Sequence, residues 1–147
     1  MMRMNRKQRA QSLVEFALIF PLVIFLITVF FDLGRAIYYF SALNNAVREG
    51  TRYAIVNDAD PTTNPSYENN VKDTIILYAA GVGINYGNIT VIKPVPGPPS
   101  GGGNYSQVTI TVTYNFQPVT PGLALVLKGG IITIKTESSM RAAPSTH

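Results

Sequence analysis

An almost uninterrupted apolar run, Phe16 to Phe31, is the feature that most constrains how this 147-residue chain can fold. The run contains no charge, and Thr28 is its only polar residue. With Leu13 and Val14 it comes near the lower limit for a membrane-spanning helix, roughly 17 to 25 residues. The basic residues before the run are Arg3, Arg6, Lys7 and Arg9. By the positive-inside rule, we expect the N-terminus in the cytoplasm and the rest of the chain outside.

This run is a better candidate for a retained helix than for an ordinary signal peptide. A signal peptide has an apolar core of about 7 to 15 residues followed by a small-x-small cleavage site. The core here is longer, and residues 30–33 (Phe-Phe-Asp-Leu) offer no such site. Pro21 lies within the run and removes one helical hydrogen bond, so we expect a kink or a local loosening around Phe16 to Pro21.

The composition excludes several classes of function. The net charge of +4 comes from the first ten residues, which hold four basic and no acidic residues, so the basic balance does not indicate nucleic-acid binding. There is no cysteine, the one histidine is His147, and we find no nucleophile or phosphate-binding motif. We therefore expect no enzyme, no catalytic residue and no cofactor. Asn57, Asp58 and Asp60 could offer oxygens to Ca²⁺, but capping or solvated roles are more common in such turns, and we expect no metal site.

The apolar helix continues beyond the membrane segment. Apolar and small residues recur after Phe31 at successive spacings of three and one, which is helical periodicity: Leu33, Ala36, Ile37, Phe40, Leu43, Ala46, Val47, Gly50 and Tyr53. Polar residues fall on the opposite side, at Ser41, Asn45, Arg48, Glu49 and Arg52. The sequence thus predicts one helix from about Ser12 to about Val56, first transmembrane and then amphipathic.

The remainder predicts a small head of mixed structure. We expect a short second helix and three strands, at residues 67–80, 88–93, 105–116 and 131–140. Residues 123–127 are left unassigned. The predicted fold class is α+β: a long N-terminal helix packed on a small antiparallel sheet of about three strands, plus a short second helix.

Three charged residues near the ends of the apolar run need an explanation. Glu15 lies at the edge of the hydrocarbon, where a carboxylate either reaches the interface or pairs with another subunit; position alone favours the first. Asp32 and Arg35 are three apart on one helix face. They form either an interfacial ion pair worth a few tenths of a kcal/mol or a bridge between subunits, and the sequence leaves both open. The aromatic residues near this boundary resemble an interfacial belt: Phe30, Phe31, Tyr38, Tyr39 and Phe40.

Three stretches in the first third of the chain resemble a known family. Residues 9–21 read Arg-Ala-Gln-Ser-Leu-Val-Glu-Phe-Ala-Leu-Ile-Phe-Pro, residues 32–36 read Asp-Leu-Gly-Arg-Ala, and residues 46–52 read Ala-Val-Arg-Glu-Gly-Thr-Arg. This pattern is similar to the TadE-like family of the Tad (tight adherence) pilus system, whose members resemble type IV prepilins. Ala10 stands where Gly is more usual in the family. The resemblance implies a pilin-like fold.

The resemblance also implies roles for individual residues. A prepilin peptidase would cut between Ala10 and Gln11, so that the processing site comprises Ala10, Gln11, Glu15 and Phe16. The chain would then divide into a cytoplasmic leader (1–10), a transmembrane or filament-core helix (11–32) and a globular head (33–147). Glu15 would pair with the new N-terminal amine of the same or an adjacent subunit. The residues expected to act in assembly are Glu15, Pro21, Asp32 and Arg35.

By the same resemblance, the expected function is a structural subunit of an extracellular pilus. The chain would cross the inner membrane once before assembly and lie at the cell surface afterwards. Its expected partners are copies of itself or other pilins, the prepilin peptidase, an inner-membrane assembly platform and membrane lipid. Two alternatives remain open: a minor pilin or pseudopilin that primes or tips a pilus of another subunit, and a membrane-anchored binding domain that never assembles.

Overall fold

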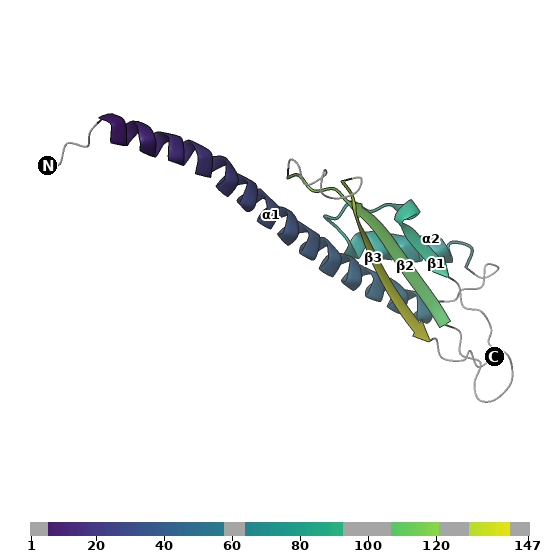
Figure 1. Cartoon of the computed structure of the whole chain (residues 1–147). Helices are drawn as coiled ribbons and strands as arrows, with labels where there is room; N and C mark the ends of the chain where they lie inside the picture. The colour runs from purple at the N-terminus through teal and green to yellow at the C-terminus, as the bar shows by residue number, and fades with distance from the viewer. Residues whose placement is uncertain (1–5, 58–63, 93–106, 121–129, 142–147) are drawn as a thin grey trace. The chain divides into compact units, whose positions relative to one another are not determined.

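The computed structural model describes residues 6–57, 64–92, 107–120 and 130–141, and its fold is the predicted α+β (Figure 1). The elements in chain order are α1 (Arg6–Val56), α2 (Tyr67–Tyr78), the short 3-10 helix η1 (Tyr86–Asn88), β1 (Ile89–Ile92), β2 (Gln107–Phe116) and β3 (Ile132–Arg141). The contacts group the chain into two compact units, one of residues 1–36 with 117–132 and one of residues 37–116 with 133–147. Helix α1 contributes to both.

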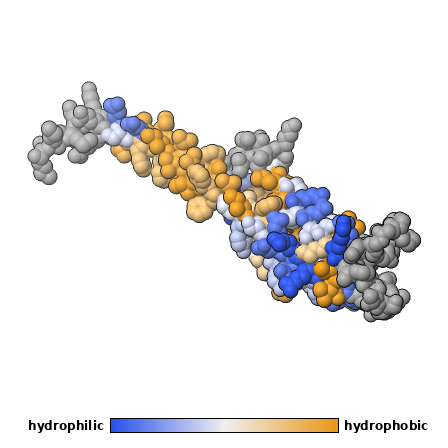
Figure 2. Space-filling view, turned by 90° about the horizontal axis from the view of Figure 1, so that it is seen from below, coloured by the Kyte–Doolittle hydropathy of each residue, from blue (hydrophilic) through white to orange (hydrophobic). Residues whose placement is uncertain are grey.

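Helix α1 is continuous over 51 residues, including Pro21. Its N-terminal half, residues 10–31, contains no buried residue. Figure 2 shows apolar side chains covering the visible face of this half. An 18-residue window of the helix has a mean hydropathy of 2.7 and lies entirely outside the core, so α1 is long and apolar enough to cross a membrane.

In the second unit, α2 packs its apolar side against the C-terminal part of α1. Its buried residues are Tyr67, Val71 and Ile75. Glu68 lies in the first turn, where a negative charge suits the helix dipole, and it pairs with Lys72 at 2.8 Å. Gly81 has a φ of +93°, which lets the chain turn away as the sequence predicts. The helix itself ends at Tyr78, two residues before the predicted end.

The three strands form one sheet in the order β1-β2-β3 (Figure 1). β1 pairs antiparallel with β2, with Ile89 opposite Val112 and Val91 opposite Ile110. The alternation predicted for β2 is confirmed: Val108, Ile110, Val112 and Phe116 are buried. β3 likewise buries Ile134 and Thr136 on one side. The predicted strand residues Lys93, Tyr105 and Ser106, and the unassigned segment 123–127, lie outside the described residues.

The core of the second unit joins the inner faces of α1, α2 and the sheet. From α1 it takes Leu43, Ala46, Val47, Gly50, Thr51 and Ala54. Tyr39 also packs against the sheet, edge-on to Tyr114 and Phe116 with ring centroids 5.7 Å away in both cases. Tyr39 therefore belongs to the head and not to a ring of interfacial aromatics.

One sequence prediction about α1 is wrong in part. Leu43, Ala46, Val47 and Gly50 lie on the buried face as predicted. Leu33, Ile37 and Phe40, which were assigned to the same face, are 55%, 59% and 51% exposed. Phe40 and Val47 are seven residues apart and lie on the same side of α1, but only Val47 is buried, so exposure changes along the helix and not around it.

Candidate processing and assembly site

The bond between Ala10 and Gln11 lies inside α1. The helix begins at Arg6, about six residues earlier than the sequence predicts, so both residues are helical as well as exposed. Gln11 and Glu15 are one helical turn apart and therefore lie on the same side of α1. Phe16 is exposed and stacks on Phe20 with a centroid distance of 5.4 Å. The four residues predicted for processing thus occupy about two turns of one exposed helix.

Glu15 is a carboxylate on an apolar helix surface. Its neighbours Leu13, Val14 and Phe16 are 68%, 69% and 62% exposed. The part of the chain that the structure describes contains no ion pair or hydrogen bond of the Glu15 side chain. When this apolar surface of α1 is removed from water, the Glu15 carboxylate needs either a partner from another molecule or access to the membrane–water interface.

Pro21 leaves one backbone acceptor of α1 without its usual donor. A proline has no N–H, so the carbonyl of Ala17, four residues earlier, loses its helical hydrogen bond. α1 nevertheless continues through this position. The predicted kink or loosening stays a prediction.

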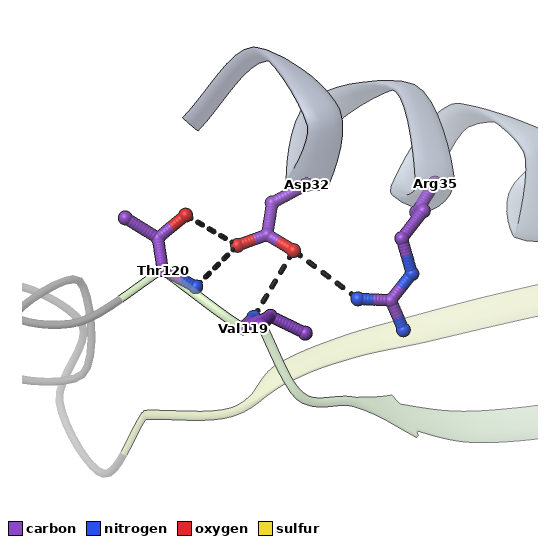
Figure 3. Close-up of polar contacts among 4 residues, drawn as sticks. All are labelled: Asp32, Arg35, Val119 and Thr120. Carbon is purple, nitrogen blue, oxygen red and sulfur yellow. Dashed lines mark hydrogen bonds and ion pairs between the residues drawn. The ribbon is translucent and has the colours of Figure 1, made fainter. Parts of the chain in front are cut away.

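Asp32 makes several polar contacts within the first unit (Figure 3). Its side chain is buried, with 5% of the residue exposed. One carboxylate oxygen accepts hydrogen bonds from the backbone N–H of Thr120 at 2.7 Å and from its hydroxyl at 2.6 Å. The other accepts from the backbone N–H of Val119 at 3.0 Å. These contacts bind the segment around Thr120 to α1, 88 residues earlier in the chain. We call this arrangement the Asp32 clasp.

Arg35 completes the polar contact around Asp32. Its Nη1 lies 3.2 Å from Oδ1 of Asp32, while 41% of its side chain stays exposed. The ion pair within one chain, one of the two alternatives for these residues, is therefore present. A bridge between subunits stays a prediction.

Sequence reasoning did not identify Val119 and Thr120 as partners of Asp32. A carboxylate at the end of an apolar run needs donors, and that signal could have been read. The residue type does not indicate which backbone N–H groups will bind the carboxylate, because every non-proline residue has one.

The carboxylates considered for a metal ion, Asp58 and Asp60, lie outside the described residues. Within those residues, no cluster of three or more His, Cys, Asp or Glu could hold a metal ion.

The comparison with protein families gives a match in the N-terminal third of the chain. A family model described as TadE-like protein matches residues 10–52. We call the matched residues 10–52 the TadE-like segment. No curated protein and no solved structure was found to match the chain.

The TadE-like segment contains the residues discussed above that lie on α1. It begins at Ala10, next to the expected cleavage bond, and includes Glu15, Pro21, Asp32 and Arg35. It ends at Arg52, inside the part of α1 that packs on the head. The segment therefore combines the exposed N-terminal half of the helix with most of its packed C-terminal part.

Proposed function

We propose that this chain is a structural subunit of a Tad-type pilus, cleaved between Ala10 and Gln11 and polymerised through the N-terminal half of α1. The observation that carries the proposal is the apolar window of α1 that the chain's own core leaves uncovered. A surface of this size needs lipid or protein to cover it. A pilin meets that need twice, first with the bilayer and then with the helices of neighbouring subunits.

The family match supports the same function. The TadE-like segment starts at the residue that would precede the cut. Cleavage needs the helix to open around Ala10, because a helical peptide bond is not presented to a peptidase as an extended strand. The bond lies within the first turns of α1, where opening costs little free energy, since helix ends fray.

In this proposal Glu15 fixes the relative position of the packed helices. After the cut, the new amine of Gln11 would lie one turn before Glu15, and helical side chains lean toward the N-terminus. An amine of the same or a neighbouring subunit can then pair with the carboxylate. Removing one partner strands the other in an apolar environment at a cost of about 3–5 kcal/mol. Packings that leave Glu15 unmatched are disfavoured by that amount.

Purification of surface filaments tests the proposal. Filaments sheared from cells are separated by mass, and the mature N-terminus is sequenced. We expect this chain as the dominant component, beginning at Gln11. A trace amount beginning at Gln11 would make it a minor pilin. A chain that keeps Met1, stays in the membrane fraction and appears in no filament would contradict the proposal and leave the non-assembling anchor.

A further inference from the structure

Residues 118–120 carry an exposed apolar side chain next to the Asp32 clasp. Val119 is 75% exposed, whereas Thr120 beside it is 4% exposed. A single exposed valine is common on protein surfaces and needs no explanation by itself. The position of Val119 is what requires one, because its backbone is bonded to the residue at which the apolar run of α1 ends.

The clasp fixes the level of Val119 along α1. Asp32 directly follows Phe31, the last residue of the apolar run, and Phe31 is 71% exposed. The backbone nitrogen of Val119 lies 3.0 Å from one carboxylate oxygen of Asp32, and that of Thr120 lies 2.7 Å from the other. These residues all belong to the same compact unit. Where the apolar run of α1 leaves a bilayer, Val119 therefore lies at the same level.

Residues 118–120 present no unbonded backbone donor. Pro118 has no N–H, and the N–H groups of Val119 and Thr120 both donate to Asp32. The hydroxyl of Thr120 also donates to Asp32, at 2.6 Å. A loop in water can leave its N–H groups to the solvent, but a segment at the apolar edge of a bilayer has to bond them within the protein. The residues around Val119 meet this requirement.

The charge of Asp32 is likewise no obstacle to contact with lipid. A carboxylate at the edge of the hydrocarbon normally keeps its surroundings in water, because its desolvation is costly. Asp32 is 5% exposed, accepts the three hydrogen bonds described above and pairs with Arg35 at 3.2 Å. Arg35 keeps 41% of its side chain exposed, which suits a cation at the membrane–water interface. Asp32 is therefore already desolvated and bonded within the protein.

We propose that Val119 is a second membrane contact of this chain: its side chain rests in the interfacial layer of the bilayer where α1 leaves it, and the Asp32 clasp holds it there. The occupant is lipid for two reasons. The donors of residues 118–120 are directed to Asp32, and the uncovered apolar run that ends beside Val119 is long enough to cross a membrane. The inference concerns the unassembled chain and does not depend on filament formation.

Two matched valines test the contact. The chain has no cysteine, so Val119→Cys and Val56→Cys can each carry a single nitroxide label. Val56 is the control because it is 77% exposed and ends α1, about 36 Å beyond Asp32 along the helix axis. The whole purified chain is reconstituted in phosphatidylcholine vesicles, at a lipid excess that leaves most vesicles with a single chain. Electron paramagnetic resonance then measures the collisions of each label with oxygen and with a water-soluble nickel chelate.

We expect the Val119 label to collide about tenfold less often with the nickel chelate than the Val56 label does, because a polar, hydrated probe is excluded from an apolar layer. Its collisions with oxygen, which is apolar, should be more frequent. Equal nickel collision rates at the two positions would overturn the inference. Protection of Val119 that appears only when several chains share a vesicle would overturn it in favour of a protein neighbour.

Asp32→Ala tests whether the clasp holds Val119 in place. The substitution removes both acceptor oxygens, so the Val119 label should then collide with nickel nearly as often as the Val56 label. Arg35→Ala is the control, because it leaves the three hydrogen bonds to Asp32 intact and should keep most of the protection. Protection that persists in Asp32→Ala would overturn the role of the clasp. A protected Val119 label in a chain that forms no filaments would support the inference while the proposed function fails, so the two failures are distinguishable.

Discussion

The two halves of α1 belong to one helix but face different surroundings. Residues 10–31 contain no buried side chain, whereas residues 37–56 include Leu43, Ala46, Val47, Gly50, Thr51 and Ala54, all buried. The N-terminal half is apolar on nearly all sides, whereas the C-terminal half is apolar on one side and polar on the other. The difference lies in where the covering atoms come from. The C-terminal half is covered by its own chain, and the N-terminal half has to be covered by lipid or another molecule.

The largest effect is expected for Glu15→Ala, which acts on the uncovered half alone. The variant should insert into the membrane, be cleaved and fold its head normally, yet form no filaments, because the N-terminal amine loses its partner at a cost of about 3–5 kcal/mol. Filament yield is measured by shearing, alongside cleavage and head stability. Glu15→Asp keeps the charge and serves as the control, with a smaller loss expected. Wild-type yield from Glu15→Ala would show that the carboxylate only reaches the interface.

Asp32→Asn tests the contact that closes the N-terminal unit. The amide keeps one acceptor oxygen and presents an NH₂ group where the carboxylate accepted from Thr120 or Val119. Hydrogen bonds to a charged group contribute about 1.5–3 kcal/mol each, so the free energy of opening around Thr120 should fall by about that amount. Hydrogen exchange at the Val119 and Thr120 amides measures it. Thr120→Ser keeps the hydroxyl, so its amides should exchange much like those of the wild type. Unchanged exchange in Asp32→Asn would contradict the assignment of the Asp32 clasp.

Asp32 also illustrates what the sequence could and could not predict. The element types, the order of the elements and the buried face of β2 followed from local periodicity, which depends on near neighbours. The partners of Asp32 lie 87 and 88 residues away, and no local pattern marks them. The exposure of Leu33, Ile37 and Phe40 was missed for a related reason. An apolar position reads the same whether its own chain or another molecule covers it.

Alanine substitutions at two glycines of α1 compare a packed position of the helix with an unpacked one. A Cβ at Gly50 would overlap Cγ1 of Ile75 and lie 2.8 Å from its Cδ1, whereas a Cβ at Gly34 meets nothing within 4 Å. Gly50→Ala should destabilise the head by about 1–2 kcal/mol, since overpacking of about 1–3 kcal/mol outweighs the gain in helix propensity. Gly34→Ala should leave the head unchanged or stabilise α1 by up to about 1 kcal/mol.

Denaturant unfolding of the detergent-solubilised chain measures both glycine variants. Ile75→Ala removes the two atoms in the way, so the cost of Gly50→Ala should shrink in that background. If Gly50→Ala and Gly34→Ala had the same effect, the close approach of α2 to α1 would be wrong.

Tyr67→Phe probes the hydrogen bond that joins α2 to the end of α1. The buried hydroxyl of Tyr67 donates to the carbonyl of Ala54 at 2.8 Å. Its loss should cost about 1 kcal/mol. Burial raises the pKa of Tyr67 above its ordinary value of 10.0, so the folded state holds the proton that the unfolded state releases. Stability should therefore fall as pH rises above about 10, and less steeply in Tyr67→Phe, when unfolding is followed across that range. Identical alkaline profiles would contradict the assignment.

The smallest effect is expected for Thr136→Val, which tests how fully the head covers itself. Thr136 is 3% exposed, and its hydroxyl has no hydrogen-bond partner among the residues that the structure describes. Replacing a buried, unpaired hydroxyl with a methyl group of similar size should stabilise the head by about 1 kcal/mol, measured by the shift in the denaturant midpoint. Thr133→Val on the exposed side of β3 is the control; it removes only a solvent-exposed hydrogen bond to Asn115 at 3.3 Å and should change little. A loss of stability in Thr136→Val would mean that the hydroxyl has a hydrogen-bond partner. The sheet face that packs on α1 would then not be wholly apolar, and the contrast between the two halves of α1 would be weaker.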